Sequence, residues 1–332
     1  MRSVLFVVAV AFLAGACTDT EPEVGAADSP TAQTTAEPDR ASLGVAFSPR
    51  SYTGSDLPDF LSLVEPEVDL LMHAGDWAEL ADPGSPFHVF STLATDRGHD
   101  FVMVISPSSG DELLRPLDAP TRDDYLRWLR DYLRDHQPAH LGLANEVNML
   151  AVRDPAGYRA VVELWDAALP IVRELAPDTT VFVTFQYERT IGRHDGWFGG
   201  QVVPADWSVI DDFVGMDAVA FTTYPSLVLD DPADMSPDYY TRIASWTELP
   251  VIFTEVGWTA DETLPILPGS EAEQVAFIDA FDAQLAALDG VAAVWSFVHG
   301  DLVADLPFAE MDLRRGDGAA RPSWDRWLAV GD

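Results

Sequence analysis

The sequence predicts an α/β fold, a single (β/α)8 or TIM barrel over residues 41–332, from three observations. Eight apolar runs of strand length recur along this region, and amphipathic stretches separate most of them. Connections that lead into the runs are short, as at Gln137-Pro138-Ala139, whereas connections that leave them are long, as at residues 258–270. Long loops after the strands are typical of barrel enzymes, which build their sites at that end.

The eight predicted strands are listed here by residue number: 43–47, 68–73, 101–105, 141–144, 181–185, 218–222, 251–254 and 292–297. The clearest predicted helices cover residues 123–134, 157–175 and 271–288, with apolar residues three and four apart. Between the fifth and sixth strands only residues 208–213 look helical. A doubly wound open sheet is the alternative, but Phe47-Ser48-Pro49-Arg50 lacks the glycine-rich phosphate turn that such sheets usually carry after an early strand.

The first 40 residues predict a targeting segment and a tether. Arg2 precedes an apolar run at residues 4–13, which is too short for a stable membrane span. Leu13-Ala14-Gly15-Ala16-Cys17 resembles the lipobox of bacterial lipoproteins, which implies a signal peptide over residues 1–16 and a lipid attached to Cys17. Residues 17–40 are acidic and rich in Pro, Thr and Ala, as disordered tethers are. We therefore expect a lipid-anchored protein on the extracytoplasmic side of the membrane; the alternative is a secreted protein.

Composition excludes some partners. The chain of 332 residues has a formal net charge of −36, and all 19 of its basic residues are arginines. Such a charge repels phosphate backbones, so we expect no nucleic-acid partner. Solubility or a saline habitat explains the acidity without a specific role. The single cysteine allows no intramolecular disulfide, so the core alone must hold the fold, which we expect to be a monomer.

Two predicted strands end in a glutamate. Leu143-Ala144-Asn145-Glu146 ends the fourth strand, and Val251-Ile252-Phe253-Thr254-Glu255 ends the seventh. Two carboxyl groups at the same end of one barrel are what hydrolysis of a glycosidic bond requires, one as proton donor and one as nucleophile. The structural alternative is a pair of carboxylates held by arginines. Glu188 is a further acidic residue near a strand end.

Together these motifs resemble the clan A glycoside hydrolases, which are retaining (β/α)8 enzymes. The resemblance rests on Asn145-Glu146, on Tyr224-Pro225 after the sixth strand, and on Thr254-Glu255-Val256-Gly257-Trp258 at the seventh. Gly75-Asp76-Trp77 after the second strand also resembles the family 53 endo-β-1,4-galactanases. The resemblance covers about residues 42–328 and implies catalysis by Glu146 as acid/base and Glu255 as nucleophile.

Further residues are predicted to bind substrate, each with a structural alternative. Asn145 would reach the sugar 2-hydroxyl, or it caps the strand end. Tyr224 would donate a hydrogen bond to Glu255, or it anchors a turn. Trp295 would floor the cleaved subsite, and Trp77 and Trp258 would stack on sugars. The alternative for these tryptophans is core packing. His73 would line the pocket, unless it is an ordinary buried histidine.

The mechanism requires no cofactor, and the histidines show no metal-binding spacing. The sequence thus predicts an exported hydrolase that cleaves a neutral poly- or oligosaccharide by a retaining mechanism. A carbohydrate-binding surface lipoprotein on a catalytically inactive barrel is the first alternative, and a scaffold or adhesion protein is the second. The sequence does not indicate which glycan is bound or whether cleavage is endo or exo.

Overall fold

The computed structural model describes residues 41–193, 203–264, 267–288, 290–303 and 308–331. The predicted signal peptide, Cys17 and the tether therefore lie outside the described residues. Within these ranges, none of the helices has the length and apolar composition needed to cross a membrane.

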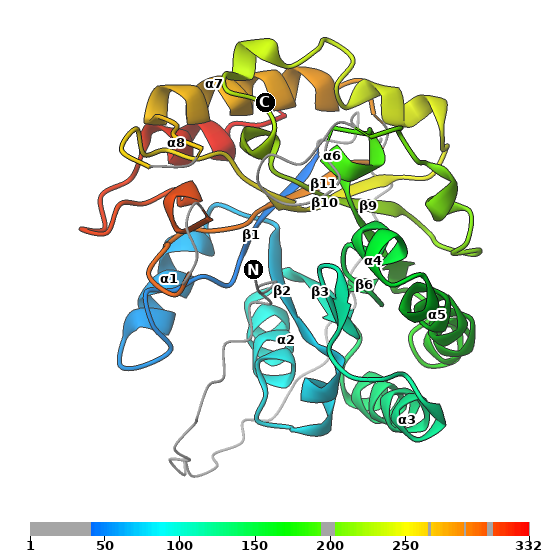
Figure 1. Ribbon diagram of the computed structural model, residues 1–332. Coiled ribbons are helices and arrows are strands. Elements are labelled where there is room, and N and C mark those ends of the chain that lie inside the picture. Colours follow the sequence, from blue (N-terminus) through cyan, green and yellow to red (C-terminus); the bar gives the residue numbers. More distant parts are fainter. Residues whose placement is uncertain (1–40, 194–202, 265–266, 289, 304–307, 332) are drawn as a thin grey trace, which may run out of the picture.

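The described chain is built around one parallel sheet (Figure 1). Its strands are β1 (Ser42–Ala46), β2 (Leu70–Asp76), β3 (Asp100–Ser106), β6 (His140–Gly142), β7 (Thr180–Phe182), β8 (Thr184–Gln186), β9 (Val219–Thr223), β10 (Val251–Val256) and β11 (Ala292–Trp295). Their order in the sheet is β7-β6-β3-β2-β1-β11-β10-β9-β8, and all pairs are parallel. The first and last members, β7 and β8, are separated only by Val183 along the chain.

The break at Val183 is where one strand changes partner. β7 pairs with β6 and β8 pairs with β9, so the two halves act as one strand that joins both ends of the sheet. Because β7 and β8 are counted as one strand, the nine strands of the sheet occupy eight positions in the barrel. The predicted (β/α)8 barrel is therefore confirmed, and the predicted fifth strand, residues 181–185, is the one that is split.

Helices lie around the outside of the strands in Figure 1. They are α1 (Asp56–Val64), α2 (Pro86–Arg97), α3 (Ala119–Asp135), α4 (Val147–Arg153), α5 (Pro155–Leu175), α6 (Tyr187–Thr190), α7 (Glu271–Leu285) and α8 (Pro322–Leu328). Side-chain caps start the longest of these: Asp118 accepts from Thr121 N–H at 3.1 Å, and Asp154 accepts from Gly157 N–H at 2.9 Å. Such caps satisfy amide groups that have no partner within the helix.

Two connections depart from the regular alternation. The predicted helix at residues 208–213 is only the 3-10 turn η2 (Ser208–Ile210), because so short an apolar stretch gains little by forming a full helix. The described connection from β9 to β10 contains three 3-10 turns, η3 (Pro225–Leu227), η4 (Pro232–Asp234) and η5 (Thr241–Ser245), and no α-helix. After β3, the short strands β4 (Ser108–Ser109) and β5 (Glu112–Leu113) form a small antiparallel pair. The remaining 3-10 turns are η1 (Trp77–Ala81) and η6 (Phe308–Met311).

The core has an inner and an outer layer, set by the period-two alternation of the strands. The inner layer fills the barrel with residues of modest size: Leu70, Met72, Val102, Val104, Phe182, Ala218, Ala220, Ile252, Ala292 and Val294. The larger outer layer lies between strands and helices and includes Val251, Phe253, Ala293 and Trp295. Residues next to each other on a strand thus belong to different layers.

Strand β10 breaks this alternation at its end. Val251 and Phe253 belong to the outer layer and Ile252 to the inner one, so regular alternation would place Glu255 outward and Val256 inward. Instead Val256 belongs to the outer layer, and the pairing register of β10 shifts against both neighbours after Phe253. This irregularity is a β-bulge, which adds one residue and reverses the phase. The bulge is therefore what turns Glu255 toward the barrel interior.

Candidate active site

Glu146 lies four residues after the end of β6, the fourth barrel strand, and directly before α4. Its backbone has φ 49°, a left-handed conformation that is uncommon outside glycine. The amide of Glu146 donates to Thr184 Oγ1 at 2.8 Å, which ties this turn to β8. Strained backbone of this kind persists where surrounding contacts impose it, and it is frequent at functional sites.

The Glu146 carboxyl group is buried, with 5% of the residue exposed. Thr222, which follows the inner-layer residue Ala220 by two positions on β9, donates to Glu146 Oε1 at 2.6 Å. Burial and, to a smaller extent, the nearby Glu255 carboxylate together raise the pKa of Glu146 to about 8, against the opposing effect of the hydrogen bond from Thr222. At neutral pH Glu146 is therefore protonated, as a general acid must be.

Glu255 lies in a more strongly hydrogen-bonded environment. Tyr224 donates from its hydroxyl group to Glu255 Oε2 at 2.6 Å, the contact that the sequence led us to expect. Burial raises the pKa of Glu255, while hydrogen bonds from Tyr224 and then Asn145 lower it. The Thr184 hydroxyl group donates to Asn145 Oδ1, which leaves the amide group of Asn145 to donate to Glu255.

The two carboxyl groups therefore titrate as a pair. Glu146 is buried and Glu255 is half-buried, and the charge of Glu255 raises the pKa of Glu146. A pair of this kind favours a state with one proton. Hydrogen-bond donors stabilise the charged form, and Glu255 has the stronger set of them. The proton consequently stays on Glu146, and the negative charge stays on Glu255.

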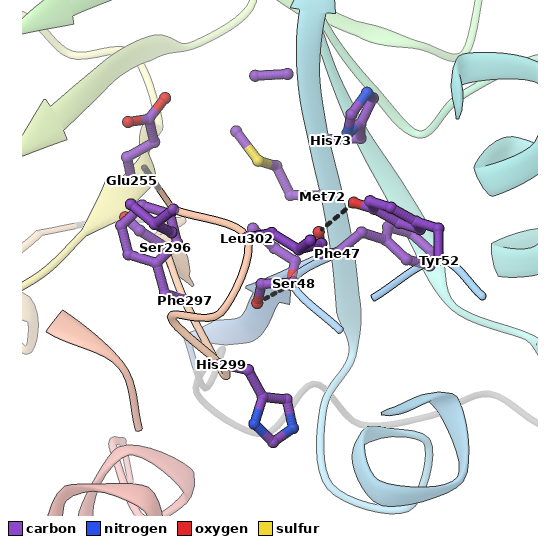
Figure 2. Close-up of a pocket in the computed structure, with 13 residues that line it drawn as sticks. Phe47, Ser48, Tyr52, Met72, His73, Glu255, Ser296, Phe297, His299 and Leu302 are labelled. Carbon is purple, nitrogen blue, oxygen red and sulfur yellow. Dashed lines mark hydrogen bonds between the residues drawn. The ribbon is translucent and has the colours of Figure 1, made fainter. Parts of the chain in front are cut away.

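A hollow with a cavity volume of about 90 Å³ opens beside Glu255 (Figure 2). Its walls come from β1 and β2 and from the segment after β11, and include Phe47, Tyr52, Met72, His73, Phe297 and Leu302. Figure 2 shows Glu255 on one side of the hollow and Met72 with His73 on the other. The predicted nucleophile thus faces a space that a small molecule can enter.

His73 is placed on the wall of this hollow, as the sequence led us to expect. Its ring meets the edges of Phe87 and Phe90, with both centroids 5.0 Å away. Burial lowers the pKa of His73 to about 3, so the ring is uncharged at neutral pH. Its Nε2 atom is buried and has no hydrogen-bond partner among the described residues.

Trp77 and Trp258 do not present a face to the hollow. Trp77 is 0% exposed, stacks on Tyr125 with centroids 5.3 Å apart, and donates to the Tyr125 carbonyl oxygen. Trp258 is 1% exposed and stacks on Phe277 at 5.4 Å. Both rings are covered by protein, so the sugar-stacking role predicted for them is replaced by core packing.

Trp295 also differs from its prediction. Its ring is 0% exposed, packs against Trp327 and Phe277, and donates to the Met311 carbonyl oxygen at 2.9 Å. Regular alternation on β11 places Trp295 outward with Ala293. Ser296, the next residue, lines the hollow instead and lies 2.9 Å from the Tyr224 hydroxyl group. The floor of the hollow is therefore not a tryptophan.

Sequence reasoning missed the hydroxyl groups that hold the pair. Thr184, Thr222 and Ser296 each contact the carboxyl groups or a residue bound to them. The available signal was alternation: Thr184 and Thr222 continue the phase of the inner-layer residues Phe182 and Ala220. Among the described residues, no cluster of three or more His, Cys, Asp or Glu side chains has the arrangement of a metal site.

Comparison with solved structures places the fold among the clan A glycoside hydrolases. The exo-β-1,4-mannosidase Op5Man5 from Opitutaceae bacterium strain TAV5 matches with a TM-score of 0.63 and 15% identity, over 87% of this chain and 58% of the other. A fungal β-1,4-galactanase matches with a TM-score of 0.60 and 13% identity, over 88% of this chain and 100% of the other. Xylanase 10B from Thermotoga maritima matches with a TM-score of 0.59 and 11% identity, over 88% and 94%.

These likenesses show the fold alone, because the identities are low. The chain spans 58% of the mannosidase, so that protein contains regions with no counterpart here. No protein-family model matches the sequence, and no curated protein matches it significantly. The predicted resemblance to clan A, galactanases included, is thus confirmed as a resemblance of structure.

Proposed function

We propose that this protein is a glycoside hydrolase that cleaves a neutral poly- or oligosaccharide by a retaining, two-glutamate mechanism. The observation that carries the proposal is the pair of glutamates after barrel strand β6 and on β10, of which Glu146 is buried with one hydrogen-bond donor while Glu255 accepts from Tyr224 and Asn145. A protonated Glu146 and an ionised Glu255 are the states in which such an enzyme waits for substrate.

In the first step, the Glu255 carboxylate attacks the anomeric carbon while Glu146 protonates the leaving oxygen, and the glycosidic bond breaks. The product is a covalent glycosyl ester on Glu255. In the second step, the ionised Glu146 takes a proton from water, which attacks the anomeric carbon and releases Glu255 as a carboxylate. Tyr224 orients Glu255, and Asn145 bridges Glu255 and the sugar 2-hydroxyl group.

The test is release of reducing ends from galactan, mannan, xylan, glucans and arabinan by the purified protein. Glu255→Ala should lower the rate by at least about 10³-fold, because it removes the nucleophile. Glu163→Ala is the matched control, since the Glu163 side chain is 66% exposed on helix α5. A retained anomeric configuration in the first product, read by NMR, supports the two-step mechanism. Inversion contradicts it.

The alternative function is carbohydrate binding by an inactive barrel. This alternative would be established if the folded protein binds a glycan on an array but releases no reducing ends from any of the glycans tested. Equal rates for the wild type and Glu255→Ala would show that another group is the nucleophile.

We further propose that the protein is a monomer exported and anchored to the membrane by a lipid on Cys17, supported by the lipobox-like segment and the tether composition of residues 17–40. Cys17→Ser should move the protein from the membrane fraction to the medium. Retention of this variant in the membrane fraction contradicts the anchor, and secretion of the wild type supports an ordinary signal peptide.

A further inference from the structure

The hollow beside Glu255 is unusually apolar for a place that would bind a sugar. Its wall includes Phe47, Met72, Phe297, Leu302 and Val303, with two alanines on β1 and β2. Among the described residues, no arginine, aspartate, asparagine or glutamine lines it, and the one charged group that they place on its wall is Glu255. A common hexose carries several hydroxyl groups, each of which needs a partner when it leaves water.

The polar groups on the wall are mostly engaged within the protein. Ser48 Oγ donates to the Ala46 carbonyl oxygen at 3.0 Å and accepts from Val298 N–H at 2.7 Å. The Tyr52 hydroxyl group donates to the Phe47 carbonyl oxygen at 3.2 Å. The bond from Ser48 to Ala46 and the bond from Tyr52 to Phe47 are drawn as dashed lines in Figure 2.

Ser296 Oγ is engaged as well, with the Val256 carbonyl oxygen at 3.1 Å and the Tyr224 hydroxyl group at 2.9 Å. His299 turns its ring away from Glu255 in Figure 2. His73 Nε2 and His299 Nδ1 are the buried side-chain atoms of the wall that have no hydrogen-bond partner among the described residues. The wall therefore offers a sugar far fewer hydrogen bonds than the sugar gives up to water.

The position of the hollow decides which part of a substrate it receives. In the ring of eight barrel strands, β11 lies opposite β6, while β1 and β2 lie three and two places from β6, so the hollow over β1, β2 and β11 lies mostly on the side of the barrel away from the strand that leads to Glu146. The acid contacts the leaving group, and the nucleophile contacts the sugar whose anomeric carbon reacts. The hollow touches Glu255, so it would receive that sugar. This placement rests on the proposed function.

We propose that the hollow selects a sugar in which a methyl group replaces a hydroxymethyl group or is attached to a hydroxyl oxygen, as in 6-deoxy and O-methylated sugars respectively. A methyl group gains from contact with Met72, Phe297 and Val303. A hydroxyl group in the same place would be buried without a partner, which apolar pockets disfavour by roughly 10-fold to 100-fold in affinity.

The test compares binding of matched phenyl thioglycosides, which resist hydrolysis, by titration calorimetry with the full chain. The first pair is β-D-fucoside and β-D-galactoside, and the second is 6-deoxy-β-D-glucoside and β-D-glucoside. Members of a pair differ only at O6. We expect one deoxy sugar, or the 6-O-methyl derivative of its parent, to bind about 10-fold more tightly than the parent. Equal or tighter binding of both parents, or no binding by any of these sugars at millimolar concentration, overturns the proposal.

Variants locate the preference in the hollow. Val303→Thr keeps the shape of the side chain and adds a hydroxyl group, so it should reduce the preference several-fold. Ala74→Ser, on β2, is the second such variant in case the first does not fold. Val162→Thr, on helix α5 and away from the hollow, is the matched control and should leave the preference unchanged. A preference that none of the variants alters arises elsewhere, which also overturns the proposal.

This experiment is separable from the test of hydrolysis because thioglycoside binding needs no catalysis. Selective binding without release of reducing ends from any glycan would support the apolar subsite and contradict the proposed hydrolase. Hydrolysis of a glycan together with no preference for the methylated or deoxy sugars would do the reverse.

Discussion

Two buried glutamates of this barrel, Glu188 and Glu146, have different surroundings. Glu188, just after β8, is 0% exposed and accepts four hydrogen bonds, from Gln186, Thr223, Tyr224 and Tyr239. Glu146 is nearly as buried, yet the described residues give it one hydrogen-bond donor, Thr222. Glu188 does not line the hollow, whereas Glu255 does, and Glu255 is near enough to Glu146 for its charge to raise the pKa of Glu146.

The difference separates a structural carboxylate from a reactive one. Four donors stabilise the charge of Glu188, and through the Tyr224 amide and the Thr223 hydroxyl group they fix the segment that carries Tyr224. Glu146 has too few donors to hold a charge in a buried place, so it keeps its proton. Burial alone therefore does not identify a catalytic group, and the number of hydrogen-bond donors is what distinguishes Glu146 from Glu188.

The largest expected effect is on Glu146. Glu146→Ala should lower kcat on a natural glycan by about 10²-fold to 10⁴-fold, because the leaving oxygen loses its proton donor. Glycosides with activated leaving groups, such as dinitrophenyl glycosides, need no acid for the first step and should lose much less. Steady-state kinetics on both substrate types measure this. Equal losses on the two would contradict the role of Glu146 as acid.

The second expected effect comes from replacing Glu188 by glutamine, and the third comes from the same replacement at Glu146. Glu188→Gln can keep an oxygen for the donors Gln186 Nε2 and Tyr224 N–H, but it then places its NH2 group against the Thr223 and Tyr239 hydroxyl groups, so the one or two hydrogen bonds that these hydroxyl groups now donate are lost. We expect the free energy of unfolding to fall by about 2 kcal/mol. Denaturant unfolding measures it, with Glu163→Gln as the exposed control.

Glu146→Gln should have the opposite sign. The pKa of Glu146 is about 8 in the folded protein and near 4.3 in the unfolded chain, so the wild type loses stability as pH rises between these values. The glutamine variant does not titrate and should be more stable by about 2 kcal/mol at pH 8, with little difference at pH 4. Denaturant unfolding measured across pH checks this. If Glu146→Gln lowers the free energy of unfolding at pH 8, as Glu188→Gln is expected to do, the proposed difference between the two glutamates is wrong.

The barrel was predictable because its signal repeats. Eight apolar runs with helices between them depend on burial, which the sequence shows directly, and the long loops placed the site at one end. Glu146 and Glu255 were visible because a carboxyl group at the end of an apolar strand is conspicuous. Tyr224 was found through its motif and lies where the proposed role needs it.

Side-chain direction was harder to predict. Trp295 was assigned to the floor although its phase with Ala293 indicated the outer layer, so here the available signal was not used. Glu255 is the converse case, because its phase with Phe253 would have placed it outside. The bulge that turns it inward arises from pairing with β9 and β11, which are distant in sequence. Local patterns cannot contain that information.

The bulge in β10 has a consequence for how sites of this kind are recognised across distant relatives. It is comparable to a frame shift in a coding sequence, because one extra residue reverses the inward or outward direction of every side chain that follows it in the strand. Two chains can both read Thr-Glu-x-Gly-Trp, yet only the chain with the extra residue directs its glutamate to the axis of the barrel. A matching sequence motif is therefore not enough to assign the nucleophile of a distant relative. The number of residues in the strand before the glutamate must be compared as well.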